Sequence, residues 1–234
     1  MITLTVTNVE ESEGARGRFL ITVKLSGDNT GEEEVRTFSV FRYFVKTSPY
    51  FQGNIPTVGD FLTSEGFESL EACEAATLAT VKAVSMLAYT DRTAKKLGEQ
   101  LRKKGFSREA TDAAVGFCVE KRYIREEEQL ARLMALLCEK KLYGIRRIRN
   151  EVYQKGFPKE TLDAVWEDTL CALDFEEALD KRMQKLKKSA FSTPKEKQKT
   201  YAALMRYGFS SDEIAHAYKR NISCFTAECD DEEF

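Results

Sequence analysis

Lysine and arginine side chains are concentrated in the middle of this sequence, where they could bind an acidic partner. Residues 92–155 carry 17 Lys and Arg against 9 Asp and Glu, whereas residues 1–78 carry 6 against 12 and residues 156–234 carry 12 against 16. A basic segment between acidic ones is typical of a surface for carboxylates or phosphates, although solvated helix faces would leave the same pattern. The candidate partner-binding residues are Lys95, Lys96, Arg102, Lys103, Lys104, Arg122, Arg146, Arg147, Arg149 and Lys155.

The densest part of this charge lies in a predicted amphipathic helix at residues 145–155. Arg146 and Arg149 are three positions apart and share one face of that helix, while Ile145, Ile148 and Val152 face inward. A guanidinium group suits planar, two-point contact with a carboxylate or a phosphate. We therefore expect Arg146, Arg147 and Arg149 to form the centre of partner binding. Trp166, in the next predicted helix, is expected to belong to the core rather than to a stacking surface.

The residues that could catalyse a reaction are not arranged for catalysis. The single histidine, His216, has no nucleophile or metal ligand at a spacing that would build a catalytic triad or a zinc site. The six cysteines form no C-x-x-C motif. The two glycine-rich motifs that bind phosphate groups, G-x-x-x-x-G-K-[ST] and G-x-G-x-x-G, do not occur in the sequence. We therefore expect a protein that is not an enzyme and that has no metal site and no cofactor.

Targeting signals and membrane spans are not expected either. No apolar run approaches the ~18 residues that a membrane span needs, and no basic leader precedes the first apolar residues. Most of the cysteines fall within helical patterns, where they are typical of small buried residues in a reducing compartment. A cytoplasmic protein without membrane contact is the expectation.

A repeated Gly-Phe corner organises the chain that must position these basic residues. Lys-Gly-Phe occurs at Gly105 and Gly156, and a weaker copy follows at Gly208, at intervals of 51 and 52 residues. Glycine can end a helix in the left-handed conformation, and the Ser or Pro after each Phe can begin the next helix. Each copy therefore predicts a helix, a corner and a second helix. We expect Phe106 and Phe157 to be buried at equivalent corners.

The predicted fold class is α+β and mostly α: a small N-terminal antiparallel β-sheet followed by three tandem three-helix repeats. Alternating apolar residues predict three strands at 2–9, 19–25 and 35–40, and helices follow from about residue 70. The segment 57–70 is expected to supply a short helix and a connection. The expected segments are a β-rich extension at 1–64, repeats at 65–124, 125–173 and 174–222, and an acidic disordered tail at 223–234.

The order and spacing of several short motifs carry a family resemblance. These motifs stand at residues 91–93, 101–106, 121–124, 142–149 and 155–157. Together they resemble the RecX family of bacterial regulatory proteins, most strongly over about residues 75–163. Three short segments depart from the family pattern. Its Gly-Tyr-Leu-Asp-Asp corner is Arg122-Tyr123-Ile124-Arg125-Glu126 here, its following Phe-Ala is Leu130-Ala131, and its Gly-Pro before the Arg-rich helix is Gly144-Ile145.

The resemblance implies both a fold and a partner. The RecX family consists of tandem three-helix repeats that bind the RecA recombinase filament and inhibit or tune it. The N-terminal strands resemble the small β extension of some Gram-positive members. A second hypothesis, from the basic surface itself, is a helical repeat module that binds single- or double-stranded DNA directly. A third is an adaptor for another acidic protein. A monomer is expected in each case.

Overall fold

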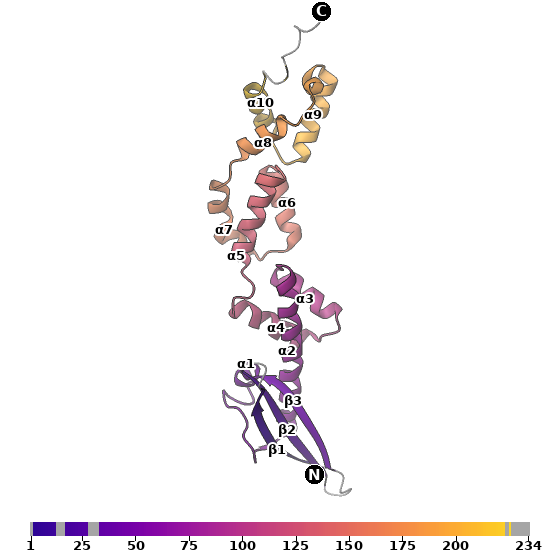
Figure 1. The fold of residues 1–234 in the computed structure, drawn as a ribbon, viewed down its shortest axis with the longest axis vertical. Coiled ribbons are helices and arrows are strands. Elements are labelled where there is room, and N and C mark those ends of the chain that lie inside the picture. Colours follow the sequence, from indigo (N-terminus) through magenta and orange to yellow (C-terminus); the bar gives the residue numbers. More distant parts are fainter. Residues whose placement is uncertain (1, 13–16, 28–32, 223–224, 226–234) are drawn as a thin grey trace, which may run out of the picture. The chain divides into compact units, whose positions relative to one another are not determined.

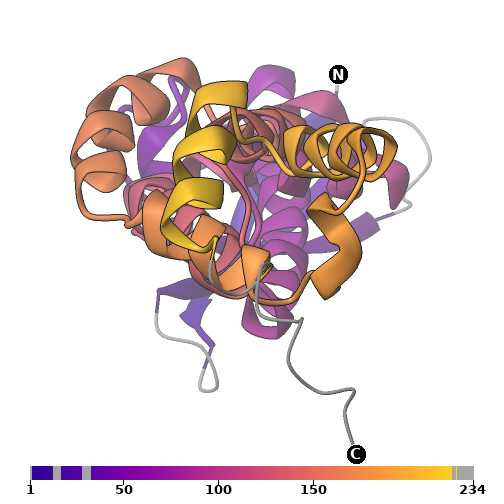
Figure 2. The ribbon, with the colours of Figure 1, turned by 90° about the horizontal axis from the view of Figure 1, so that it is seen from above.

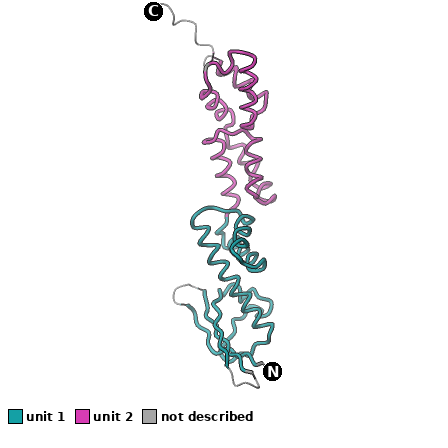
Figure 3. The backbone as a smooth tube through the Cα atoms, turned by 90° about the vertical axis from the view of Figure 1, so that its right-hand side faces the viewer, with its two compact units in different colours: residues 1–124 teal, residues 125–234 magenta. Residues whose placement is uncertain are grey.

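The computed structural model describes most of the chain, including the whole basic segment at residues 92–155. The described residues are 2–12, 17–27, 33–222 and 225. They form two compact units, Met1–Ile124 and Arg125–Phe234, each of which is described by itself (Figure 3). Apart from Phe225, the expected acidic tail lies outside the described residues.

The first unit begins with a four-stranded antiparallel sheet in the order β3-β2-β1-β4 (Figure 1). The three strands expected from the sequence are confirmed, and a fourth is added within the segment that was expected to contribute only a helix and a connection. The added strand has two residues, which pair with Leu4 and Thr5, and it is too short to show an alternating pattern. The strands are β1 Ile2–Glu11, β2 Arg18–Gly27, β3 Glu33–Phe41 and β4 Phe61–Leu62.

A 26-residue helix, α2 (Ser64–Tyr89), joins this sheet to the first repeat. Its first half packs on the sheet through buried residues such as Leu70, and its second half contributes Ala79 and Ala83 to the core of the repeat. The helix also covers the free edge of β3, where the Phe41 N–H donates to the Thr77 hydroxyl at 2.9 Å. The β extension and the first repeat are therefore one packed body.

Three-helix units follow as the repeated corners predict. Gly105, Gly156 and Gly208 have positive φ angles of 91°, 74° and 99°, and each lies between two helices rather than inside one. Figure 2 shows the helices of the third repeat, α8 to α10, in orange to yellow. The helices are α1 Arg42–Thr47, α3 Ala94–Lys103, α4 Arg108–Glu120, α5 Glu126–Ala135, α6 Ile145–Lys155, α7 Lys159–Cys171, α8 Phe175–Met183, α9 Pro194–Arg206 and α10 Ser211–Arg220; a π-helical turn, Leu136–Lys140, extends α5, and a 3₁₀ turn, Lys188–Phe191, precedes α9.

The burial of the corner phenylalanines differs from the expectation. Phe106 and Phe157 are only half-buried, whereas Phe209, in the weakest copy of the motif, is 1% exposed. The first corner has open space beside it, since a Cβ added at Gly105 would meet no atom within 4 Å. The third corner instead packs against the start of α6. Complete burial of the phenylalanine therefore requires a neighbouring helix as well as the corner itself.

Replacing Phe106 or Phe157 with alanine should accordingly destabilise the protein only moderately. Complete removal of a buried phenylalanine costs about 3–5 kcal/mol, and a half-buried ring should cost roughly half of that, about 1.5–2.5 kcal/mol. Urea unfolding followed by circular dichroism measures the change. A loss above about 4 kcal/mol for either variant would contradict the half-buried packing.

The contact between the third corner and α6 has almost no room for side chains. The Gly144 N–H donates to the Tyr207 carbonyl oxygen at 2.8 Å. A Cβ added at Gly144 would lie 2.5 Å from the Gly208 oxygen, and a Cβ at Gly208 would lie 2.4 Å from the Arg147 nitrogen. Both glycines are thus required by the close approach of two backbones, which ties the second and third repeats together.

An arginine of α8 strengthens the same junction. The Arg182 Nε donates to the Leu142 carbonyl at 3.2 Å, and its Nη2 donates to the Lys141 carbonyl at 2.7 Å. Its guanidinium carbon lies 3.4 Å from the centre of the Tyr207 ring. Arg182 therefore satisfies carbonyls at the end of the α5 helix that have no partner within that helix, and it fixes the third repeat to the second.

Candidate partner-binding surface

The basic residues of α3 form an exposed face in the first unit. Thr93 caps this helix by accepting a hydrogen bond from the Lys96 N–H at 3.3 Å. Leu97 and Leu101 are fully buried against α2 and α4, so the helix turns its charged side outward. The exposed basic residues of this helix and its C-cap are Lys95, Lys96, Arg102, Lys103 and Lys104, with the exposed Glu99 among them.

Most of the α3 charge is available to a partner. Arg102 lies 3.9 Å from the Asp112 carboxylate, which also pairs with Arg108 at 3.6 Å. Pairs this exposed contribute little to stability and compete weakly with a binding partner. The α3 face is therefore cationic and free to reorganise on binding.

Arg122 follows α4 in a backbone conformation that favours glycine. The Gly-Tyr-Leu-Asp-Asp corner that it resembles has glycine at this position. The φ of Arg122 is 57°, in the left-handed region. The Arg122 N–H donates to the Val119 carbonyl at 3.0 Å, and the Tyr123 N–H donates to the Cys118 carbonyl at 2.8 Å. This pair of bonds is the Schellman ending of a helix, in which glycine is preferred at the left-handed position. Arg122 is exposed, as expected, but its backbone is strained.

Replacing Arg122 with glycine should stabilise the first unit by about 1 kcal/mol, because the left-handed conformation costs a residue with a Cβ roughly 1–2 kcal/mol. Arg122→Ala serves as the control, since it removes the same charge and keeps the strain. Thermal unfolding followed by circular dichroism should show a higher midpoint for the glycine variant than for the alanine variant. Equal unfolding midpoints for the two variants would show that the backbone at Arg122 is not strained.

The arginines of α6 are exposed on the second unit but do not form one cluster. Arg146 has no hydrogen bond or ion pair among the residues that the structure describes. Arg149 lies on the side of α6 that faces α7, where its guanidinium carbon is 5.4 Å from the centre of the Trp166 ring. Ile148 and Val152 face inward, as the periodicity predicts. Arg146 and Arg149 thus remain without a carboxylate partner in the described part of the chain.

A hollow of about 380 Å³ runs between α6 and α7 beside Arg149. Trp166 is half-buried there, and Tyr153 is 81% exposed on the same rim. Asp163 and Glu167 complete the α7 side. Trp166 packs against the core of the repeat, as expected, and also offers an exposed edge to this hollow, which the sequence analysis did not anticipate.

Arg147 has a different environment from its two neighbours. Its Nη2 lies 2.8 Å from the Glu151 carboxylate, and its guanidinium carbon is 5.5 Å from the centre of the Tyr143 ring. A second hollow of about 400 Å³ is lined by Tyr143, Arg147, Arg206 and Tyr207. Sequence reasoning did not single out Arg206 or Tyr207 for this surface, because the third repeat brings them to α6 from a distant part of the chain.

The ten candidate residues divide between the two units. Six lie in the first unit, on α3 and at the end of α4, and four lie in the second, on α6. Lys155 is the last residue of α6, where a cation is favoured by the helix dipole. The candidate residues are therefore divided between the α3 face and the end of α4 in the first unit and α6 in the second.

The described residues do not bring together a set of groups suited to metal binding. His216 is exposed on α10, and no group of three His, Cys, Asp or Glu within the described ranges could hold a metal ion. Burial raises the pKa of the Cys73, Cys118 and Cys138 thiols to about 11, so they stay protonated and unreactive near neutral pH. Across the part of the chain that the structure covers, no helix is long and apolar enough to cross a membrane.

Comparison with known proteins identifies the repeats. The first three-helix domain of RecX matches residues 79–118, and the third matches residues 175–218. The regulatory protein RecX of Haemophilus influenzae (strain PittGG) is 28% identical over 143 residues, which are 60% of this chain and 92% of that protein. The regulatory protein RecX of Listeria innocua serovar 6a is 25% identical over 155 residues, which are 66% of this chain and 58% of that protein.

Solved structures show the same fold. A crystal structure of regulatory protein RecX aligns with 92% of this chain and 99% of its own, with a TM-score of 0.70 and 18% identity. The crystal structure of RecX from Lactobacillus salivarius aligns with 62% of this chain and 96% of its own, with a TM-score of 0.54 and 18% identity. With its three-helix units and its N-terminal sheet, the chain has the fold of these RecX structures, and its sequence is similar to that of RecX regulatory proteins, most clearly in the first and third three-helix domains.

Proposed function

We propose that this chain binds the RecA recombinase filament and inhibits or modulates its activity in recombination and DNA repair, in the bacterial cytoplasm. The observation that carries the proposal is α6, a helix on which the exposed Arg146 and Arg149 have no carboxylate partner among the described residues. Similarity to RecX regulatory proteins supports a regulatory role, and the unpaired cations support an acidic partner.

The chemistry of the filament suits these cations. A nucleoprotein filament presents carboxylates and DNA phosphates at regular intervals, and tandem repeats can present cations to several of them at once. Guanidinium groups bind both kinds of oxygen through two parallel hydrogen bonds. Arg146 and Arg149 supply such groups on α6, and Lys95, Lys96, Lys103 and Lys104 supply point charges on α3.

The test is RecA-catalysed, DNA-dependent ATP hydrolysis with and without the purified chain. The proposal expects the rate to change in proportion to the amount of chain bound, and it expects the chain to co-sediment with RecA filaments. An unchanged rate at concentrations well above that of RecA, with no co-sedimentation, would exclude this function.

Direct DNA binding is a second candidate, and a specific observation favours it. Aromatic rings lie beside the arginines in both hollows of the second unit: Trp166 and Tyr153 near Arg149, and Tyr143 near Arg147. Aromatic rings next to cations are typical of single-strand binding surfaces, where bases stack and phosphates pair. Phosphate binding should weaken linearly with salt on a log–log plot, whereas modulation of RecA without measurable affinity for bare DNA would favour the first candidate.

A further inference from the structure

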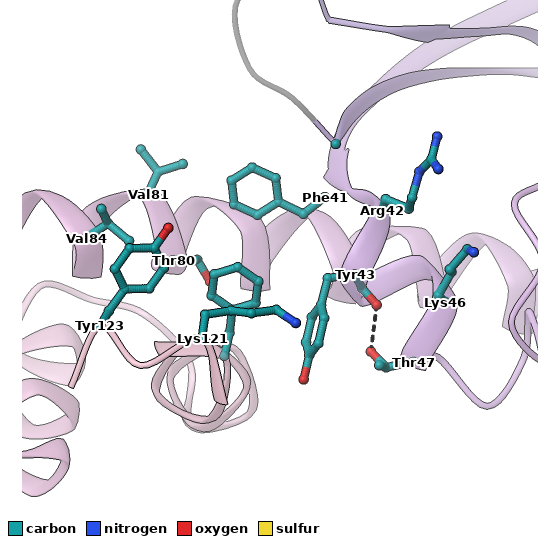
Figure 4. A pocket seen from close by; sticks show the side chains of 12 residues that line it. Phe41, Arg42, Tyr43, Lys46, Thr47, Thr80, Val81, Val84, Lys121 and Tyr123 are labelled. Atoms are coloured by element: carbon teal, nitrogen blue, oxygen red, sulfur yellow. Dashed lines mark hydrogen bonds between the residues drawn. The ribbon is translucent and has the colours of Figure 1, made fainter. Parts of the chain in front are cut away.

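The first unit contains a hollow outside the cationic faces described above. It has a volume of about 570 Å³ and lies where the end of β3 and α1 meet α2 and the end of α4 (Figure 4). Figure 4 shows Val81 and Val84 of α2 on one side, with Phe41 and Tyr123 beside them. Val81 is 45% exposed and Tyr123 is 53% exposed, so the hollow presents uncovered apolar surface.

Aromatic rings form the floor of this hollow around Phe117. The Phe41 ring is 6.1 Å from Phe117 at an interplanar angle of 11°, and the Tyr123 ring is 6.3 Å away at 25°. Tyr43 meets Phe117 edge-on at 4.9 Å. The Phe41 and Tyr123 rings are thus already stacked on Phe117.

Three cations surround this apolar floor. Arg42 and Lys46 come from α1, and Lys121 comes from the end of α4. Lys121 pairs with Glu120 at 2.8 Å, and Arg42 lies 4.0 Å from Glu11. Both pairs are exposed and readily exchanged, and Lys46 has no hydrogen bond or ion pair among the described residues.

Two of these three cations lie in a part of the first unit whose sequence is acidic overall. Residues 1–78, which form the sheet, α1 and the first part of α2, carry 12 Asp and Glu against 6 Lys and Arg. Two of these six, Arg42 and Lys46, line the hollow. An apolar cavity with a few convergent charged groups is the usual form of a binding site.

We propose that this hollow binds an acidic peptide segment that carries an aromatic or large apolar side chain. That side chain occupies the space above Val81, Val84 and the ring edges, and the flanking carboxylates pair with Lys46, Arg42 and Lys121. A nucleotide fits less well, because neighbouring rings are already stacked on Phe117 and no amide side chain lines the hollow to read a base edge. The site is independent of the proposed contact through α6.

The test is fluorescence anisotropy with the full chain and a fluorescein-labelled peptide, Asp-Glu-Asp-Phe-Glu-Asp. Lys46→Glu and Val81→Asp should each weaken binding by about tenfold or more, since each removes a central contact and adds a repulsive charge. A peptide with Ala in place of Phe should bind the parent chain more weakly by a similar factor. Lys82→Glu is the matched control, because Lys82 lies on the same helix but does not line the hollow, and binding should stay within about twofold.

Two results would overturn this site. Equal binding of the labelled peptide to the parent chain, to Lys46→Glu and to Val81→Asp would show that the hollow is not involved. An oligo(dT) strand that displaces the peptide, and whose own binding falls in the same two variants, would assign the hollow to nucleic acid instead. Circular dichroism of each variant verifies that the fold is retained.

Discussion

Gly208→Ala should destabilise the second unit by about 2–5 kcal/mol. The new Cβ would lie 2.4 Å from the Arg147 nitrogen and 2.6 Å from the Arg147 Cβ, distances at which a backbone must move. It would also place a side chain at a φ of 99°. The left-handed strain costs roughly 1–2 kcal/mol, and forced overpacking costs about 1–3 kcal/mol more. Such a loss is comparable to the total stability of many domains.

Two other glycines separate these contributions. Gly105→Ala should incur only the strain, about 1–2 kcal/mol, because its φ is 91° and its Cβ would meet nothing within 4 Å. Gly144→Ala should incur only the overpacking, about 1–3 kcal/mol, since its φ is −80° and its Cβ would lie 2.5 Å from the Gly208 oxygen.

Urea unfolding measures all three variants. Trp166 is the only tryptophan, so its fluorescence reports the second unit, while circular dichroism reports both units. In the double variant, the losses of stability from Gly144→Ala and Gly208→Ala should not add. Either substitution alone already forces the same two backbone segments apart, so the second has little left to disrupt. Equal losses for Gly105→Ala and Gly208→Ala would show that the third corner is not held against α6.

The local parts of this fold could be predicted from the sequence. A glycine at a helix end, a Ser or Thr cap and an apolar residue every three or four positions act within one helix and its corner. They therefore predicted α6, with Arg146, Arg147 and Arg149 exposed on it. The same reasoning predicted the first three strands, in which apolar residues alternate over several positions.

The non-local parts could not be predicted in this way. The contact between Gly144 and Gly208 joins residues 64 positions apart, and neither position alone indicates the other. The same junction brings Arg206 and Tyr207 of the third repeat to the hollow beside Arg147, which no pattern within α6 indicates. The hollow around Phe117 likewise combines residues of β3, α1, α2 and α4, so it has no signature in any one stretch.

Reversing the charge of Arg146 and Arg149 together should weaken modulation of RecA by about 100-fold or more. Both side chains are exposed and have no carboxylate partner in the described structure, so their replacement by Glu should change the stability by no more than about 0.5 kcal/mol per site. At a complementary interface, like charges cost several kcal/mol, and each 1.4 kcal/mol is a factor of ten in affinity. The measurement is the concentration of the variant that gives half-maximal change in RecA ATP hydrolysis.

The matched control is Lys195→Glu with Lys199→Glu, which makes the same change of charge on the exposed face of α9. Folding of both double variants is checked by circular dichroism rather than by fluorescence, because Arg149 lies over Trp166 and its loss alters the emission directly. An effect confined to the α6 variant would locate the contact on that helix. Equal losses in both variants would indicate a general attraction to a polyanion, and full activity of the α6 variant would mean that its arginines are only a solvated face.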